Sequence, residues 1–290
     1  MTYFYRTLQG LLFRRDSATE GMRARVFTTN YDPISELALE KVGLDYEDGF
    51  AGRLKPQFDI GNYGTVRYMR SLHYATSRES PTVDLHKLHG SITWKRALTG
   101  LEFDGDMSTI RSIQSVLDAN PISRFAGGIS GKSVADLEAE IARWTPASHE
   151  DFDVAYDQLA IVNPSSAKYS STVLEQAYYD QLRILSNELE RTNSSMFVLG
   201  FSFEDVHIRD LIIRGLDTNP TLSVYIFAYD AAAETRLRAL LSPEIRRNRN
   251  VRVVAPTTRK VRGVEKVYPW DVTNFTRLVL QPNVTVGSTS

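Results

Sequence analysis

The chain has no cysteine among its 290 residues, and this absence excludes several classes of site. Disulfides, thiolate zinc sites, iron–sulfur clusters and cysteine nucleophiles all require sulfur as a ligand or an attacking atom. Long apolar runs are absent too, since the longest, at residues 196–203, is far shorter than the roughly 20 residues that span a bilayer. The apolar stretch Leu11–Phe13 runs directly into two arginines, unlike a secretory signal. We therefore expect a cytoplasmic protein without a membrane span.

An excess of charge of either sign is also lacking, because 34 Lys and Arg residues face 35 Asp and Glu residues, a net charge of −1. A balanced chain has no global field to attract nucleic acid or an anionic membrane, so such a contact needs a local patch. One basic cluster occurs near the C-terminal end and consists of Arg246, Arg247, Arg249, Arg252, Arg259, Lys260, Arg262 and Lys266. We interpret it as a solvated edge or a subunit interface, and contact with nucleic acid stays open as an alternative.

The pattern that is present alternates short apolar runs with amphipathic segments. Hydrophobic residues make up 42% of the chain and charged residues 24%, which is enough to bury a core. Nearly continuous apolar runs are typical of strands buried on both faces. The sequence therefore predicts an α/β fold with a Rossmann-like, mostly parallel sheet flanked by helices. The predicted strands cover residues 24–29, 83–94, 158–162, 196–199, 222–227 and 251–254, and the predicted helices about 34–42, 172–189, 206–215 and 232–241.

The helix predicted at residues 34–42 carries signals at both ends. Asp32 suits the N-cap, Pro33 the first helical position and Gly43 the C-terminal stop. We therefore expect residues 29–32 to form the turn that joins the first strand to this helix.

A different pattern separates the two halves of the α/β rhythm. Apolar residues recur there at helical spacing, first as Ile110, Ile113, Val116 and Leu117 and then as Val134, Leu137, Ile141 and Trp144. The sequence predicts a helical insertion at residues 95–157, within a domain formed by residues 1–94 and 158–290.

Three polar turns lie at or after predicted strands, at residues 28–32, 89–91 and 200–202. In open parallel sheets, ligands bind where the carboxyl ends of strands meet helix N-termini. Each turn also has a plain structural interpretation when it is taken alone. Asp32 can act only as a helix cap, and His89 only as a hydrogen-bonded structural imidazole.

Taken together and in this order, the three turns resemble the motifs of the sirtuin family. Thr28-Thr29-Asn30-Tyr31-Asp32 resembles the T-Q-N-x-D motif, His89-Gly90 the catalytic H-G, and Gly200-Phe201-Ser202 the nucleotide-binding G-T-S turn. The resemblance covers roughly residues 26–227 and is strongest to the sirtuin-like domains of bacterial antiphage defence systems. Those domains are NAD⁺ hydrolases rather than deacylases.

Two departures from the sirtuin pattern bear on this resemblance. The family's first strand carries a G-A-G-x-S loop, and residues 1–25 contain only the isolated Gly10 and Gly21. The sequence thus resembles a sirtuin-like domain without its first strand–helix unit. Deacylating sirtuins also carry a four-cysteine zinc module, which this chain cannot form. The second departure favours the hydrolase branch, and we expect neither zinc nor another metal.

The resemblance implies cleavage of NAD⁺ to nicotinamide and ADP-ribose. The leaving group is already a pyridinium and departs neutral, so the reaction needs a base for water but no general acid. By resemblance, Asn30 orients the ribose and the attacking water, Asp32 holds the carboxamide and His89 acts as the base. The residues implied to contact the dinucleotide are Thr28, Thr29, Asp32, Gly90, Gly200, Ser202 and Asp230. For Asp230, a plain helix cap is the simpler interpretation.

The resemblance also implies a biological setting. Depletion of NAD⁺ upon phage infection would arrest or kill the host, so the enzyme must be controlled by assembly. We expect a homo-oligomer or a partner such as a HerA-type ATPase or a short Argonaute, which are partners of known relatives. Two alternatives stay open, an NAD-dependent protein deacylase and a catalytically silent module that binds NAD⁺ or ADP-ribose. The missing glycine loop supports the silent module, whereas the joint presence of Asn30, Asp32 and His89 argues against it.

Two further motifs are given structural interpretations. Residues 127–133 resemble a P-loop but have three residues between the glycines instead of four, so we expect an ordinary loop. His86 and His89 lie three residues apart without a third ligand nearby in the sequence, so we expect no metal site there.

Overall fold

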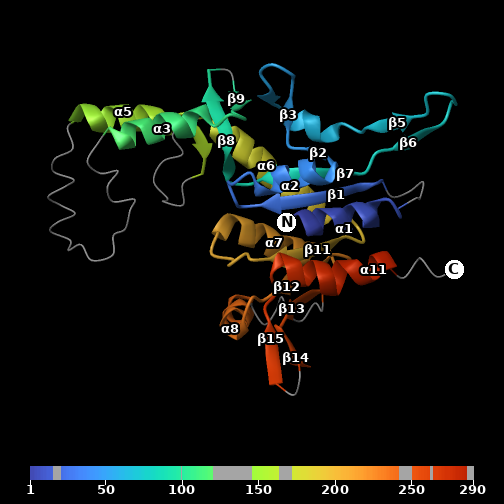
Figure 1. Ribbon diagram of the computed structural model, residues 1–290. Coiled ribbons are helices and arrows are strands. Elements are labelled where there is room, and N and C mark those ends of the chain that lie inside the picture. The colour runs from blue at the N-terminus through green and yellow to red at the C-terminus, as the bar shows by residue number, and fades with distance from the viewer. Residues whose placement is uncertain are drawn as a thin grey trace, which may run out of the picture.

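The computed structural model describes residues 1–15, 21–98, 100–119, 146–162, 172–241, 250–261 and 264–285. The chain forms an α/β fold in which parallel strands are flanked by helices, as the sequence predicts (Figure 1). One parallel sheet has the order β2 (Asp45–Glu47), β7 (Thr82–Lys87), β1 (Arg23–Thr28). The other has the order β11 (Ser195–Leu199), β12 (Ser223–Phe227), β13 (Val251–Val254).

Helices cover both faces of these sheets. The helices are α1 (Thr2–Leu12), α2 (Ile34–Val42), α6 (Thr172–Glu190), α7 (Val206–Thr218), α8 (Ala231–Leu240) and the C-terminal segments α10 (Val272–Phe275), η3 (Thr276–Leu280) and α11 (Gln281–Thr285). In the part of the chain that the structure describes, no helix is both long and apolar enough to cross a bilayer.

The central strand β7 shows how alternating side chains build the first sheet. All six of its residues are buried, because the strand has a neighbour on each edge and helices on each face. Val83 and Leu85 pack in one apolar cluster with Tyr5 of α1 and Leu39 of α2. The intervening residues Asp84 and His86 turn to the other face, toward α6. Apart from the buried pair of Lys87 with Glu36 of α2, the sheet is therefore apolar on the α1 and α2 side, and it is polar on the α6 side.

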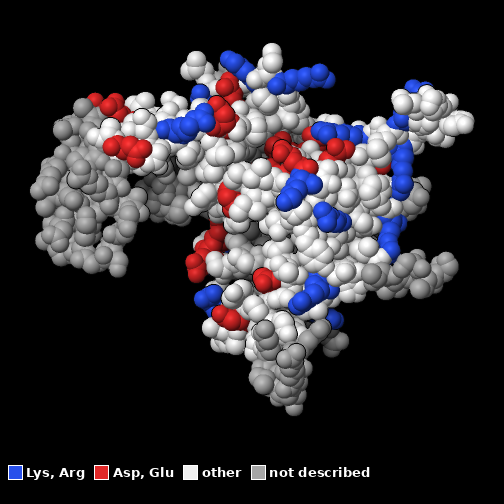
Figure 2. All heavy atoms as spheres, viewed as in Figure 1, with Lys and Arg blue, Asp and Glu red and all other residues white. Residues whose placement is uncertain are grey.

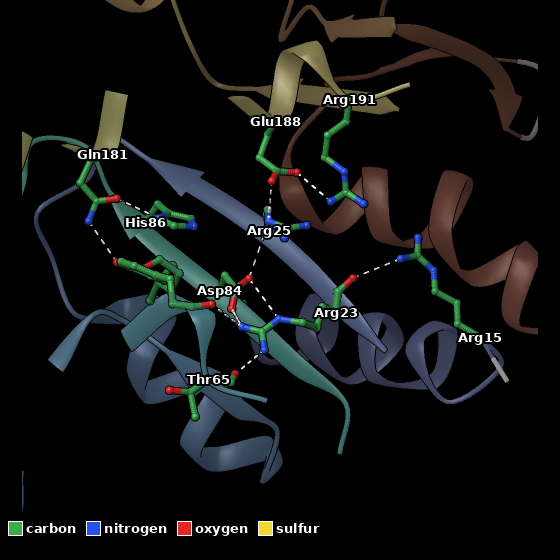
Figure 3. A network of polar contacts seen from close by, with 11 residues as sticks. Arg15, Arg23, Arg25, Thr65, Asp84, His86, Gln181, Glu188 and Arg191 are labelled. Carbon is green, nitrogen blue, oxygen red and sulfur yellow. Dashed lines mark hydrogen bonds and ion pairs between the residues drawn. The ribbon is translucent and has the colours of Figure 1, made fainter. Parts of the chain in front are cut away.

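The polar side forms a network that ties α6 to β1 and β7 (Figure 3). Asp84 is bound by Arg23, and its second oxygen lies 3.7 Å from Nε of Arg25. Arg25 in turn pairs with Glu188 of α6 at 3.1 Å. Burial raises the pKa of Asp84, and the two arginines act against that rise. The network thus compensates a carboxylate buried inside the sheet.

His86 belongs to the same face and is held as a neutral ring. It stacks between Phe27 and Tyr63, with ring centroids 4.6 and 4.1 Å away, and its Nδ1 donates to Oε1 of Gln181 at 2.8 Å. Burial lowers the pKa of His86 to about 4. This histidine is therefore a structural imidazole, and within the described residues no group of three or more His, Asp or Glu side chains could hold a metal ion.

The second sheet is apolar on both faces. On one face, Ile212 of α7 belongs to a buried cluster with Val224 and Ile226 of β12. On the other face, the rings of Trp270 and of Phe275 in α10 pack edge-on against Phe227, at centroid distances of 4.9 and 5.0 Å. These contacts complete a three-layer arrangement of helix, sheet and helix.

Residues 83–94, which were predicted as one strand, form two. β7 ends at Lys87 and β8 (Gly90–Ala97) begins after a turn at Leu88 and His89, where Gly90 has φ of 76°. β8 pairs antiparallel with its neighbours in a sheet of order β10 (Leu159–Ile161), β8, β9 (Gly100–Phe103), β4 (Gln57–Phe58), β3 (Phe50–Ala51). The apolar pattern runs through the turn, so periodicity alone does not reveal the break.

The helical insertion is only partly as predicted. Residues 95–103 complete β8 and form β9, so the helical part begins with α3 (Ser108–Asp118) and resumes with α5 (Pro146–Asp157), which project together from the body (Figure 1). The second predicted helix, near residues 134–144, and the P-loop-like residues 127–133 lie outside the described residues.

Several elements carry no clear sequence signal and were not predicted. They include α1, the 3-10 helix η1 (Ile60–Gly64), and the hairpins β5 (Tyr68–Arg70) with β6 (Ser77–Glu79) and β14 (Thr257–Val261) with β15 (Val264–Tyr268). The short strands β2, β3, β4 and β9 and the C-terminal helical segments were not predicted either. The second hairpin overlaps the basic cluster in the sequence. Of the eight side chains in that cluster, the structure describes one, Arg252, which is exposed, and the other seven lie outside the described set. On the face in Figure 2, basic and acidic side chains are interspersed over most of the described surface.

Candidate functional site at the carboxyl ends of the strands

The first two polar turns leave neighbouring strands at the same edge of the first sheet. β1 and β7 run parallel with Thr28 opposite Lys87, and the N–H of Leu88 donates to the Thr28 carbonyl at 2.9 Å. The turn that contains Asn30 therefore follows β1 beside the turn that contains His89. This adjacency is what a shared site at the carboxyl ends of parallel strands requires.

Local hydrogen bonds fix the turn after β1. The N–H of Asn30 donates to Oγ1 of Thr28 at 3.1 Å, and the N–H of Ile34 donates to Oδ1 of Asp32 at 3.0 Å. The predicted cap is therefore one residue out of place: the helix begins at Ile34, its N-cap is Pro33, and that position has no side-chain cap. Asp32 lies just before the cap and accepts the N–H of the first helical residue. Gly43 ends the helix in the left-handed conformation, with φ of 69°, which confirms the predicted stop.

Lys87 holds this turn in place through its buried side chain, and the sequence interpretation had given it no role. Its side chain is 1% exposed and forms an ion pair with Glu36 of α2 at 2.8 Å. Nζ also donates to the carbonyl of Asp32 and to Oγ of Ser91, the latter at 3.2 Å. A buried lysine is stable only when it is paired and hydrogen-bonded, so these partners are what allow it inside the fold. No distinct signal in the sequence marked it, because the same strand also carries Asp84 and His86.

His89 is paired with a residue that the sequence interpretation gave no role. Its Nε2 lies 2.9 Å from Oδ2 of Asp205, and Oδ1 of the same carboxylate accepts the N–H of Ile208 and so caps α7. An ionised carboxylate only accepts hydrogen bonds, so Nε2 donates and Nδ1 keeps the lone pair of the ring. The carboxylate therefore sets both the orientation and the tautomer of His89. The visible signal was an aspartate at a helix N-cap position soon after Gly200–Ser202.

A cavity of about 390 Å³ opens between the two parallel sheets. Its polar lining consists of Thr28 at the end of β1, Thr29 and Asn30 after it, Gly200 after β11, and Tyr229 and Asp271. The rest of the cavity is apolar and is bounded by β1, β11 and the helices that cover them. Its lining residues are Phe27, Leu88, Leu185, Met196, Phe197, Val198, Leu199, Phe201, Ile208, Ile212, Trp270 and Val272. β1 and β11 are the strands of the two sheets that flank the cavity. The first sheet continues from β1 to β7 and β2, and the second continues from β11 to β12 and β13. The strand order thus runs outward in both directions, and such a reversal is where open α/β sheets bind ligands.

Four of the nine predicted site residues, Thr28, Thr29, Asn30 and Gly200, line this cavity together. Gly200 has φ of 66°, a left-handed conformation that favours glycine. The other five do not line it: Asp32 accepts the N–H of Ile34, His89 pairs with Asp205, and Gly90, Ser202 and Asp230 lie elsewhere.

The contacts of those last three residues are local. Gly90 is buried against β10, and a Cβ added there would clash with the carbonyl oxygen of Ala160. Oγ of Ser202 accepts the N–H of Glu204 at 3.3 Å within its own turn. Asp230 is exposed and caps α8, accepting the N–H of Ala233 at 2.7 Å. The simpler interpretation of Asp230, as a helix cap, therefore describes its contacts.

A scan against protein-family models finds no match to this chain, and a search of curated proteins finds none either. The functional interpretation therefore depends on the motifs at residues 28–32, 89–90 and 200–202 and on the geometry that brings the first two onto neighbouring strands. The family resemblance stays a proposal.

Proposed function

We propose that this chain hydrolyses NAD⁺ to nicotinamide and ADP-ribose at the carboxyl ends of β1, β7 and β11. The observation that carries the proposal is the pair formed by His89 and Asp205 at 2.9 Å. His89 lies in the turn after β7, next to β1, whose end brings Asn30 to the cavity. An oriented imidazole in the turn next to a polar turn that lines a largely apolar cavity is an arrangement that suits base-assisted attack of water.

The chemistry balances with the groups of this chain and water. The bond between nicotinamide and the ribose carbon breaks, and its electron pair leaves with the neutral nicotinamide. Water adds to the same carbon, and its proton passes to Nδ1 of His89 and then to solvent. Asp205 acts as a positioning residue, because its hydrogen bond keeps the lone pair on Nδ1 and its negative charge stabilises the protonated ring.

The other site residues hold the dinucleotide in this proposal. Asn30 orients the ribose and the water, and Oδ2 of Asp32, which does not accept the N–H of Ile34, is assigned to the carboxamide. Gly200 and Ser202 face the adenosine half, where the left-handed turn at Gly200 lets backbone N–H groups approach a phosphate. No role is required of Asp230, whose carboxylate caps α8.

The proposed setting is the cytoplasm of a bacterial cell, with depletion of NAD⁺ as an antiphage defence. Control would come from a homo-oligomer or from a partner such as a HerA-type ATPase or a short Argonaute. This part of the proposal rests on the resemblance of residues 28–32, 89–90 and 200–202 to sirtuin motifs.

The test is a product analysis with the purified chain, NAD⁺ and, in a second arm, NAD⁺ with an acetyl-lysine peptide. Hydrolysis predicts equal amounts of nicotinamide and ADP-ribose in both arms, lost in Asn30→Ala and His89→Ala. Acetylated ADP-ribose that forms only with the peptide would identify a deacylase instead. Binding of NAD⁺ without turnover in the presence of either candidate partner would identify a silent module.

A further inference from the structure

The two parallel sheets face each other with open edges across the cavity. Among the strands that the structure describes, β1 pairs only with β7 and β11 only with β12, so each sheet ends in a strand with one unpaired side. The cavity lies between these sides and is lined by Phe27 of β1 and by residues 196–199 of β11. Unpaired strand edges expose rows of N–H and C=O groups, which folded proteins normally cover.

Hydrogen bonds show which backbone groups of β1 face the cavity. The carbonyl of Thr28 accepts the N–H of Leu88, so the backbone N–H and C=O groups of Thr28 point toward β7. Backbone groups alternate between the two edges of a strand, and Phe27 therefore faces away from β7. The carbonyl of Arg23, four residues earlier and on the same edge, is bonded by the side chain of Arg15 and not by a strand. Among the described residues, no hydrogen bond reaches the backbone of Phe27.

The same alternation applies to β11. The carbonyl of Ser194 accepts the N–H of Ser223, so Ser194 faces the second sheet, and Phe197 and Leu199 face the cavity. In the part of the chain that the structure describes, the backbone groups of Phe197 and Leu199 also have no hydrogen-bond partner. Two rows of unpaired backbone groups thus line opposite walls of one cavity.

Burial is incomplete at the same two strands. All six residues of β7 are buried, whereas β1 has none in that class and β11 has only Val198. Phe197 is 44% exposed, although it lies in the middle of its strand and stacks on Tyr225. Strands in this position of a doubly covered sheet are normally buried on both faces. The outer strands β2 and β13 are also incompletely buried, so the deficit follows the edge strands of both sheets, including the two that meet the cavity.

We propose that the cavity accepts one extended, apolar strand of a partner polypeptide, which joins the two sheets into one. Only a strand offers N–H and C=O groups on both of its edges and so satisfies both rows at once. Its side chains are mainly apolar on each face, because Leu185 and Ile212 line one side and Trp270 and Val272 the other, with Asp271 as an acidic neighbour of the latter pair. β1 has six residues and β11 five, so the strand needs about five residues, or roughly 17 Å.

The strand runs parallel to β1 and β11. The carboxyl-end residues Asn30, Gly200 and Tyr229 line the same cavity, so the strands before them point toward one end of it. A strand between Phe27 and Phe197 lies deeper in the cavity than the polar rim, which consists of Thr28, Thr29, Asn30 and Gly200. This inference does not depend on cleavage of NAD⁺, because it concerns the depth of the cavity and not the rim.

The test supplies the strand in cis to the full chain. The sequence Val-Ile-Val-Ile-Val is fused ahead of Met1 through a flexible ten-residue Gly/Ser linker, which spans roughly 17 Å. One control carries Val-Pro-Val-Pro-Val, which is apolar but lacks two of the N–H donors, and a second carries Lys-Glu-Lys-Glu-Lys. Hydrogen exchange is measured by NMR at the amides of Phe27, Phe197 and Leu199.

We expect exchange at these amides to slow by at least about tenfold with the apolar strand and by less than about twofold with either control. Unchanged exchange with the apolar strand, or equal protection by the proline-containing control, would overturn the proposal. Protection in the unmodified chain that grows with concentration and accompanies a dimer would also overturn it, because the occupant would then be a second copy. No arm contains NAD⁺, so failure here is separate from failure of the proposed function.

Discussion

The buried ion pair between Lys87 and Glu36 makes a sharp prediction about stability beside the candidate site. The side chains are 1% and 10% exposed, and Nζ lies 2.8 Å from Oε1 of Glu36. The second carboxylate oxygen of Glu36 is buried without a hydrogen-bond partner among the described residues. Lys87→Met keeps most of the side-chain volume and removes the charge. It leaves the carboxylate of Glu36 buried and without its counter-charge.

We expect Lys87→Met to lower the free energy of unfolding by about 3 to 5 kcal/mol, the usual cost of breaking a buried pair from one side. The double variant Lys87→Met/Glu36→Leu removes both charges, so it should recover most of that loss. The exposed pair between Arg238 and Glu234 is a matched control, with side chains 46% and 24% exposed. Arg238→Met should cost about 0.5 kcal/mol or less.

Urea denaturation followed by circular dichroism measures all four proteins under one condition. The reasoning would be refuted by a loss below about 1 kcal/mol in Lys87→Met, because the pair would then behave as a surface pair. It would also be refuted if the double variant were as unstable as the single one. In that case, the loss would come from the bonds of Lys87 to Asp32 and Ser91 rather than from a stranded charge.

Three further predictions follow from single contacts. Burial lowers the pKa of His86 to about 4 from 6.5, so the unfolded chain binds more protons between these values and stability falls as the pH falls. Relative to His86→Gln, the wild type should lose about 3 kcal/mol over this window in urea denaturation, and equal slopes would contradict the assignment. Gly90→Ala should lower the free energy of unfolding by at least about 2 kcal/mol in the same assay, because Gly90 has φ of 76° and its added Cβ would meet the carbonyl oxygen of Ala160 in β10. Gly64→Ala is the control, because a Cβ there meets nothing and should be tolerated. Asp205→Asn should keep the cap of α7 and the melting temperature. It should lower kcat for NAD⁺ at least about tenfold with KM unchanged, because the amide no longer stabilises protonated His89. A preserved kcat would remove Asp205 from the mechanism.

Local sequence signals predicted the parts of the fold that depend on neighbouring residues. The strand at residues 251–254 and the stop at Gly43 are where the apolar pattern and the glycine place them. Helices α7 and α8 agree with their predicted starts within one residue. In each case the signal is a short apolar run, a cap residue or a glycine, and its structural consequence lies within the same few residues.

The parts that were missed depend on contacts between distant residues. His89 and Asp205 are 116 positions apart, so no spacing rule connects them. The break between β7 and β8 depends on Gly90 packing against β10, which comes about 70 residues later in the chain. The buried position of Lys87 depends on Glu36, on a helix that precedes β7. The candidate site is therefore predictable as three separate turns and becomes a site only through tertiary pairing.

The most direct test of the central claim compares two histidines in one assay. His89 pairs with Asp205 at the proposed site, whereas His207 is exposed on α7 and serves as the matched control. Nicotinamide release from NAD⁺ is measured for the wild type, His89→Ala and His207→Ala, each with and without the candidate partners. We predict release by the wild type and by His207→Ala, and a loss of at least about 100-fold in His89→Ala. Equal release by all three proteins, or no release by the wild type under any condition, would contradict the proposed site.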